Sequence, residues 1–196
     1  MRTVLLLTAA ALALTACGHK ADNTAATDSN LTISDNMTVA ENETADNAAM
    51  QSAGSASVSA ADFVKNAALS DMYEIASSKL AATMATSAGL KKFAAEMITA
   101  HTATTAGLKA AIAKDGVKDM PPKALDPEHQ ALIDALKATK GADFDALYKS
   151  QQTDAHTKAL ALMQGYATSG DQMALKAFAS DTAPKVKSHL DMLKSM

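Results

Sequence analysis

Long alanine-rich stretches with few helix-breaking residues constrain the fold of this chain more than any other feature. From Ser59 onward β-branched residues are sparse, and most Gly and Pro residues fall where one stretch gives way to the next. Alanine has the highest helix propensity, whereas Gly and Pro have the lowest. The pattern contains no strand-like alternation, internal repeat or glycine-rich phosphate loop. The sequence therefore predicts an all-α domain over residues 59–196, a length suited to a single core.

The breaking and capping residues predict four long helices and one short helix. Ser59 and Asp62 have the spacing of a capping box, which places the start of the first long helix at Ser59. Asp126 and Pro127 are typical of a helix start, and Lys140–Gly141 is typical of a helix end. The four long helices are expected over residues 59–85, 90–114, 144–167 and 171–196.

The lengths of the connections predict how these helices pair. Thr86–Gly89 and Thr168–Gly170 are short turns, which force the helices on either side into antiparallel hairpins. A long crossover that contains the short helix joins the two hairpins. Pro184 cannot donate a backbone hydrogen bond to Ser180, so we expect a kink in the last helix. This is the connectivity of a ferritin-like four-helix bundle with an extra helix in the crossover.

The first seventeen residues indicate where the chain is sent. Arg2 precedes an apolar run that is too short to span a bilayer and that ends in small residues, as in a removable secretory segment. Leu14–Cys17 resembles a bacterial lipobox, whose cysteine takes lipid chains such as palmitate. We therefore expect a signal peptide at residues 1–16 and a membrane anchor at Cys17. Gly18 stands where some lipoproteins have Asp. By resemblance to enterobacterial lipoproteins, a residue other than Asp here implies a protein of the outer membrane that faces the periplasm.

Residues 17–58 are expected to form a disordered, acidic tether, because they contain almost no large apolar side chains. Residues 18–58 carry six acidic residues and one lysine, whereas residues 59–196 carry 16 lysines and 15 acidic residues. The balanced charge and scarce aromatic residues of the domain argue against nucleic-acid binding. Cys17 is the only cysteine, so the chain cannot form an internal disulfide.

Three histidines fall on the expected core-facing seams of three different helices. His101, His156 and His189 each follow the apolar residues of their helix at three- and four-residue steps. Glu74 lies as far from the first turn as His101 does, so these two side chains are expected at one level of the bundle. Counted from the second turn, His156 and His189 are expected to be about 9 Å out of register.

Buried imidazoles and a buried carboxylate need partners. They can pair with one another, or they can bind a metal ion. Glu74, His101 and His156, with His189 ranked below them, have the composition of an open two-His-one-carboxylate site for zinc, iron, manganese or copper. Methionines one or two turns from the histidines favour a copper variant, because thioethers suit Cu(I). These methionines are Met97, Met163 and Met192. The alternative is that the histidines only pack, as hydrogen-bonded residues of the core.

Several kinds of catalytic site do not fit the sequence. A ferritin-type di-iron centre needs two Glu-x-x-His motifs, but Ile98, Thr153 and Val186 stand three residues before the histidines. No nucleophile elbow or credible Cys–His pair is present. The leading interpretation is a non-catalytic, lipid-anchored module that binds a metal or small ligand, linked to envelope stress. A structural or protein-interaction lipoprotein is the alternative, and an oxidoreductase without the usual cofactor motifs is the third.

The order of residues in the domain resembles one bacterial envelope family. The segments that carry the resemblance are Phe63–Val64, Ser70–Ile75, Leu90–Ala94 with Met97 and His101, Phe144–Asp145 with Tyr148 and His156, and Leu175–Ala179 with Pro184 and His189–Leu190. They are similar to the family catalogued as domain of unknown function 4142, over residues 60–195. The resemblance implies an exported, ferritin-like four-helix bundle without a settled activity. Family members often have Asp directly before the first histidine, where this chain has Ala100, which implies a site with fewer carboxylates.

Overall fold

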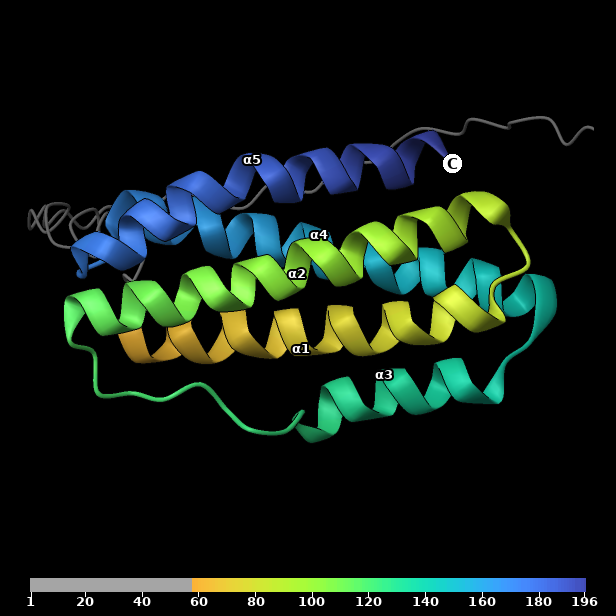
Figure 1. Cartoon of the computed structure of the whole chain (residues 1–196), viewed down its shortest axis with the longest axis horizontal. Coiled ribbons are helices and arrows are strands. Elements are labelled where there is room, and N and C mark those ends of the chain that lie inside the picture. The colour runs from red at the N-terminus through yellow and green to blue at the C-terminus, as the bar shows by residue number, and fades with distance from the viewer. Residues whose placement is uncertain (1–57) are drawn as a thin grey trace, which may run out of the picture. The chain divides into compact units, whose positions relative to one another are not determined.

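Five helices make up the part of the chain that the structure describes, residues 58–196 of a computed structural model (Figure 1). The helices are α1 (Ala60–Met84), α2 (Ala88–Asp115), α3 (Pro127–Ala138), α4 (Gly141–Ser169) and α5 (Met173–Ser195). The expected all-α class is thereby confirmed. The expected signal peptide at 1–16, the lipidated Cys17 and the tether up to residue 57 lie outside the described residues.

Local capping explains where three of the helices begin. The Ser59 hydroxyl accepts a hydrogen bond from the backbone N–H of Asp62 at 3.1 Å, as the capping-box spacing predicts. Ser87 caps α2 in the same way, and the Asp126 carboxylate caps α3. At the other end of α2, Gly116 has a φ of 68°, a left-handed conformation that glycine adopts without steric cost.

The second hairpin turn lies about two residues later than the sequence predicts. α4 continues to Ser169, and α5 begins only at Met173. The physical reason is a long-range cap, because the carboxylate of Asp115 at the end of α2 accepts hydrogen bonds from the N–H groups of Ala174 and Leu175. This contact joins residues about 60 positions apart, so local sequence patterns do not reveal it.

The start of α4 also differs from the prediction. Gly141, expected to end the short helix, instead begins α4 with a φ of 61°, and the helix starts three residues before the expected Phe144. A glycine tolerates this left-handed conformation, so the chain reverses direction at Gly141 and enters α4 at once. Pro184 lies inside α5, which continues as a helix on both sides of it.

The four long helices form a bundle of two antiparallel hairpins, as the connection lengths predict. α1 pairs with α2, and α4 pairs with α5. Across the hairpins α1 lies beside α4 and α2 beside α5, and each of these neighbours runs antiparallel (Figure 1). The short helix α3 packs on α1 and α4 at the outside of the bundle.

The core consists of two hydrophobic clusters with buried polar residues between them along the helices. One cluster contains Phe63, Tyr166 and Leu175, and the other contains Phe93 and Phe144. We call the residues between the clusters the polar layer. It comprises Asp71, Glu74, Ser77, Ser78, His101, Gln151, Gln152, His156, Thr182 and His189, all buried.

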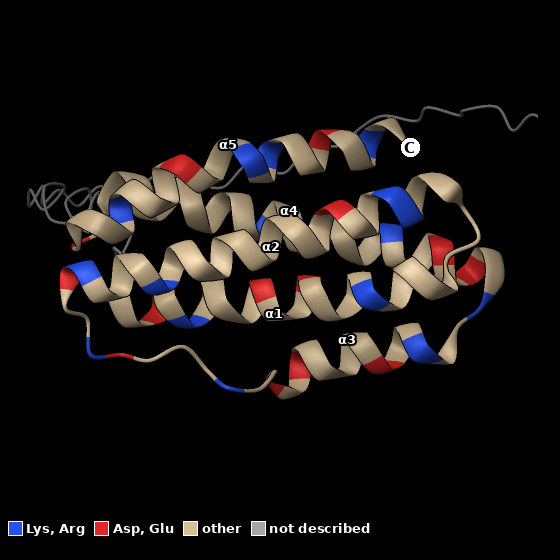
Figure 2. Ribbon diagram, viewed as in Figure 1, with Lys and Arg blue, Asp and Glu red and all other residues tan. Residues whose placement is uncertain are grey.

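Charged residues lie on all five helices, with both signs intermixed and neither sign gathered on one element (Figure 2). Among the described helices, none combines the length and the apolar character needed to cross a membrane.

Candidate metal centre

Three histidines from three helices converge in the polar layer. His101 comes from α2, His156 from α4 and His189 from α5. Their ring centroids are 5.6 Å apart for His101 and His156, 5.9 Å for His101 and His189, and 5.5 Å for His156 and His189. One ring nitrogen of each residue lies within 4.8 Å of the other two. The histidines therefore form one cluster inside the bundle, which we call the histidine cluster.

Each histidine of the cluster has a buried ring nitrogen without a hydrogen-bond partner. Nδ1 of His101 contacts Asp71 Oδ1 at 2.8 Å, and Nδ1 of His156 contacts the carbonyl oxygen of Gln152 at 2.9 Å. The nitrogens without a partner are Nε2 of His101, Nε2 of His156 and Nδ1 of His189. Buried polar atoms in folded proteins are almost always hydrogen-bonded, so three unpaired nitrogens in one place call for an explanation.

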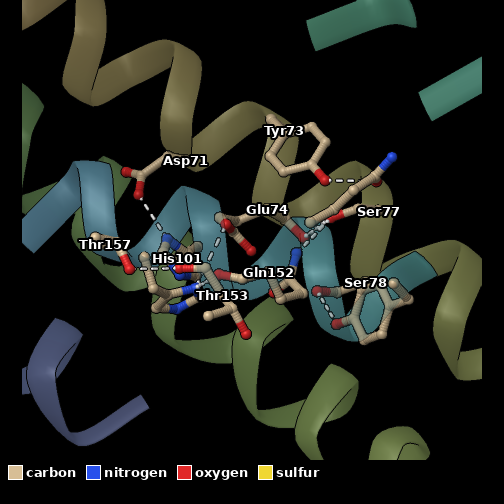
Figure 3. A network of polar contacts seen from close by, with 12 residues as sticks. Asp71, Tyr73, Glu74, Ser77, Ser78, His101, Gln152, Thr153 and Thr157 are labelled. Atoms are coloured by element: carbon tan, nitrogen blue, oxygen red, sulfur yellow. Dashed lines mark hydrogen bonds and ion pairs between the residues drawn. The ribbon is translucent and has the colours of Figure 1, made fainter. Parts of the chain in front are cut away.

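The partners of His101 and His156 set which ring nitrogen is free. A carboxylate and a carbonyl oxygen accept hydrogen bonds, so Nδ1 of each ring carries a proton, and Nε2 is the nitrogen with the lone pair when the ring is neutral. Asp71 is itself held by the hydroxyl groups of Thr104 and Thr105, which donate at 2.8 and 2.9 Å. Figure 3 shows Asp71 directed at His101 from the neighbouring helix. This arrangement matches the carboxylate–histidine pairs that orient metal ligands in proteins.

Glu74 lies in the same layer but outside the group of converging nitrogens. It is 1% exposed, and its Oε1 is 3.6 Å from Nδ1 of His156, the nitrogen that faces Gln152 rather than the cluster. Neither Glu74 oxygen has a hydrogen-bond partner. The converging group thus differs from the expected combination of Glu74, His101 and His156, because His189 provides the third nitrogen.

The expected 9 Å offset between His156 and His189 does not occur. The second hairpin turn spans Gly170–Gln172, so its centre lies closer to the midpoint between the two histidines than the expected turn did. The rings of His156 and His189 are as close as any pair in the cluster. The Asp115 cap that sets the start of α5 therefore also sets the depth of His189.

Burial and neighbouring charges shift the pKa values of Glu74 and of the three clustered histidines. Burial raises the pKa of Glu74 to about 7, against the opposing effect of the His101 charge. Burial lowers the pKa of His156 to about 3 and that of His189 to about 4, and the charge of His101 lowers both further. Burial also disfavours charge on His101, but the Asp71 hydrogen bond and the charges of Glu74 and Asp71 outweigh it and raise the pKa of His101.

The remaining sequence-predicted residues are three methionines, which belong to or pack against the hydrophobic clusters. Met97 and Met163 belong to the two opposite hydrophobic clusters, and the partly buried Met192 packs against the cluster of Met97. The copper variant that these methionines suggested stays a prediction. His129 is partly buried at the start of α3, where its Nδ1 contacts the capping Asp126 at 2.7 Å.

The sequence of the chain matches one family model, described as Domain of unknown function (DUF4142), over residues 43–196. The chain belongs to the DUF4142 family. No curated protein and no solved structure matches it. The family expected from the residue pattern is thereby confirmed.

In this DUF4142 chain a carboxylate reaches the α2 histidine from a different helix. Ala100 directly precedes His101, and Asp71 of α1 hydrogen-bonds the His101 ring. Sequence analysis missed Asp71 as a site residue. One signal was present, because Asp71 lies three residues before Glu74 and therefore on the same side of α1.

Proposed function

We propose that this chain is a lipid-anchored envelope protein whose helical domain binds one transition-metal ion without catalysing a reaction. The ligands are Nε2 of His101, Nε2 of His156 and Nδ1 of His189. One observation carries the proposal: these buried nitrogens have no hydrogen-bond partner, and their rings converge so that ligand atoms lie within 4.8 Å of one another. A bound ion would satisfy all three lone pairs at once.

The donor set selects the class of metal. Three imidazole nitrogens suit zinc and copper, and the general order of affinities places Cu²⁺ and Zn²⁺ above Mn²⁺ and Fe²⁺. Tetrahedral bonds of about 2.1 Å separate two ligand atoms by about 3.4 Å, so the rings need to close by no more than about 1.4 Å. Asp71 and the carbonyl oxygen of Gln152 hold two of the rings through their far nitrogens.

The charge state of two of the three ligands also suits a metal. Only a neutral imidazole can bind a metal ion, and burial keeps His156 and His189 neutral at neutral pH by lowering the pKa of both. The pKa of His101 is raised instead, so a metal must displace a proton from its Nε2, while Nδ1 keeps the proton that faces Asp71.

Elemental analysis of the full chain, purified without a chelator, tests the metal proposal. We expect one zinc or copper ion per chain and a higher melting temperature after either ion is added to metal-free protein. The variants His101→Ala and His156→Ala should each lose the bound metal. The matched control is His129→Ala, which removes a partly buried histidine outside the cluster and should keep full stoichiometry. The proposal is wrong if no stoichiometric metal is found and zinc, copper, iron and manganese all leave the melting temperature unchanged.

The sequence before the domain supports the membrane part of the proposal. Leu14–Cys17 has the pattern of a lipobox, and Gly18 follows it. Fractionation of bacterial cells that express the chain, together with palmitate labelling, measures the anchor. We expect the parent chain in the outer-membrane fraction with label attached, and Cys17→Ala without label. Equal labelling of both chains would overturn the anchor and leave the metal proposal unaffected.

A further inference from the structure

A long cavity runs between α2 and α5 and ends at the histidine cluster. Its volume is about 520 Å³, and α2 and α5 lie side by side over this length (Figure 1). The wall is made mostly of small residues, with Phe178 and Met163 as the large apolar side chains. The small residues include Ala100, Ala103, Gly107, Ala110, Ala174 and Ala177. Ala103 and Ala177 are exposed, so the cavity opens to solvent along one side.

Two of the unpaired nitrogens belong to residues that border this cavity. His101 is 5% exposed and His189 is 8% exposed, and both residues line the cavity. Their partnerless atoms are Nε2 and Nδ1, respectively. The cavity therefore combines an apolar wall with buried polar atoms that lack a partner, the usual composition of a small-molecule site.

The dimensions of the cavity favour a single linear chain. On α2 the lining runs from Ala100 to Lys114, which is about 21 Å along the helix axis. A volume of about 520 Å³ over that length gives a mean cross-section of about 25 Å². This is close to the cross-section of one extended hydrocarbon chain. The volume corresponds to about 17 groups of the size of a water molecule.

A lysine lines the cavity toward each end, Lys114 and Lys185, but only the histidine end also has buried polar atoms without a partner, and this end suits an anionic head group. Lys185 lines the cavity four residues before His189, and no described residue forms an ion pair with it. Asp71 lines the same end, but its two oxygens already accept hydrogen bonds from His101, Thr104 and Thr105. Asp181 also borders the cavity and is exposed to solvent. A carboxylate bound at this end would meet the ammonium group of Lys185 and the metal that we propose the histidines hold.

We propose that the cavity between α2 and α5 binds one long-chain aliphatic carboxylate, with its tail along the alanine-lined wall and its carboxylate at the histidine cluster. The inference rests on the proposed function for the metal that receives the carboxylate. The position of the tail depends only on the cavity itself, so the two proposals can fail separately.

Carbon-13 NMR of palmitate bound to the full chain tests the site and its direction. Palmitate is labelled at C1 or at C16 and added to protein loaded with paramagnetic Co²⁺, with Zn²⁺-loaded protein as the diamagnetic reference. We expect strong broadening of the C1 signal by Co²⁺ and little effect on C16. Broadening of C16 but not of C1 would overturn the proposal, because it places the tail at the histidines.

Cavity-filling variants separate the tail site from the metal site. Ala177→Leu on α5 and Ala103→Leu on α2 each place a larger side chain in the cavity at an exposed position. Both should weaken palmitate binding by about tenfold or more and keep one Co²⁺ per chain. The matched control is Ala131→Leu, at an exposed position of α3 outside the cavity, which should bind palmitate like the parent.

The remaining outcomes are equally decisive. If the chain binds metal but Ala177→Leu and Ala131→Leu bind palmitate with equal affinity, the cavity proposal is wrong. The metal proposal is then unaffected. Palmitate binding that Ala177→Leu weakens, in a chain that takes up no metal, supports the cavity and overturns the proposed function. Tighter binding of a lysophospholipid with the same acyl chain overturns the carboxylate assignment, because the ligand head is then a lipid phosphate.

Discussion

Glu74 is a carboxylate in an environment that disfavours its charged form. It is 1% exposed, and neither carboxylate oxygen has a hydrogen-bond partner. Burial raises its pKa to about 7 from the ordinary value of 4.5. The folded chain therefore keeps a proton on Glu74 over a pH range in which the unfolded chain has lost it.

Replacing Glu74 with Gln should change how stability depends on pH. Because the folded-state pKa is raised, the metal-free parent loses stability as the pH rises from about 4.5 to about 7. Gln has nearly the same shape and does not titrate. The free energy of unfolding of Glu74→Gln relative to the parent should therefore rise by roughly 3 kcal/mol across this range. Urea unfolding of both metal-free proteins at several pH values measures the difference, and parallel pH profiles would contradict the burial of an ionisable Glu74.

Asp71 acts on the histidine cluster through His101, and its effect is separable from packing. Asp71→Asn preserves the size of the side chain but weakens the charge-assisted hydrogen bond to Nδ1. Loss of such an outer partner should reduce zinc affinity by about 10–100-fold, which competition with a zinc chelator measures. Glu96→Gln, at an exposed position on α2, is the matched control and should bind zinc like the parent. Unchanged affinity in Asp71→Asn would show that Asp71 does not orient a ligand.

At the scale of the helices, two aspartates fix how the ends of the bundle meet. Asp145 of α4 accepts hydrogen bonds from the backbone N–H groups of Thr86 and Ser87, each at 2.9 Å. Asp115 of α2 does the same for the first turn of α5. Each aspartate thus ties a helix of one hairpin to the other hairpin.

Asp145→Asn should destabilise the domain at neutral pH. Burial tends to raise the pKa of Asp145, but the hydrogen bonds from Thr86 and Ser87 outweigh it, and the net pKa lies below the ordinary value of 3.8. A lowered pKa stabilises the fold above the unfolded-state value and loses that effect as the pH falls through the folded-state value. We expect a loss of about 1–2 kcal/mol at pH 7, as for other helix-end caps, in chemical denaturation.

The pH dependence separates this capping effect from a general effect of substitution. The difference between Asp145→Asn and the parent should shrink as the pH falls below about 4, where the free carboxylate of the unfolded chain becomes protonated. Asp143→Asn, an exposed change on the same helix, should differ little from the parent at either pH. A constant difference for Asp145→Asn down to pH 2 would contradict the cap.

At the scale of the whole molecule, the histidine cluster connects the two hairpins. His101 belongs to the first hairpin, whereas His156 and His189 belong to the second. An ion bound to all three therefore opposes separation of the hairpins. Zinc at a free concentration of 100 times its dissociation constant should stabilise the fold by about 2.7 kcal/mol.

Thermal and chemical unfolding with and without zinc measure this stabilisation. It should disappear in His156→Ala and persist in His129→Ala, because His129 contacts Asp126 rather than the cluster. Equal stabilisation of all three proteins by zinc would mean that the ion binds elsewhere. In that case zinc binds the protein, but not at the histidine cluster that joins the hairpins.

The features that could be predicted without the structure are helix starts and core-facing positions, which depend on residues close together in the sequence. The capping box at Ser59 and Asp62 marks the start of α1, and Asp126 with Pro127 marks the start of α3. Helical periodicity likewise identified His101 and His156 as core-facing, because a helix places residues three and four apart on one side. These features depend on contacts within about one turn, which a short stretch of sequence contains.

The features that could not be predicted are the depth of His189 and the partners of the histidines, which depend on contacts between different helices. The depth of His189 depends on where α5 begins, and Asp115 at the end of α2 sets that point. The carboxylate beside His101 comes from Asp71 on another helix, and Glu74 faces the other side of His156. By itself the sequence determined the helices, their pairing and the family. Only the tertiary structure decided which side chains meet, because the rotation and depth of each helix depend on contacts between residues far apart in the chain.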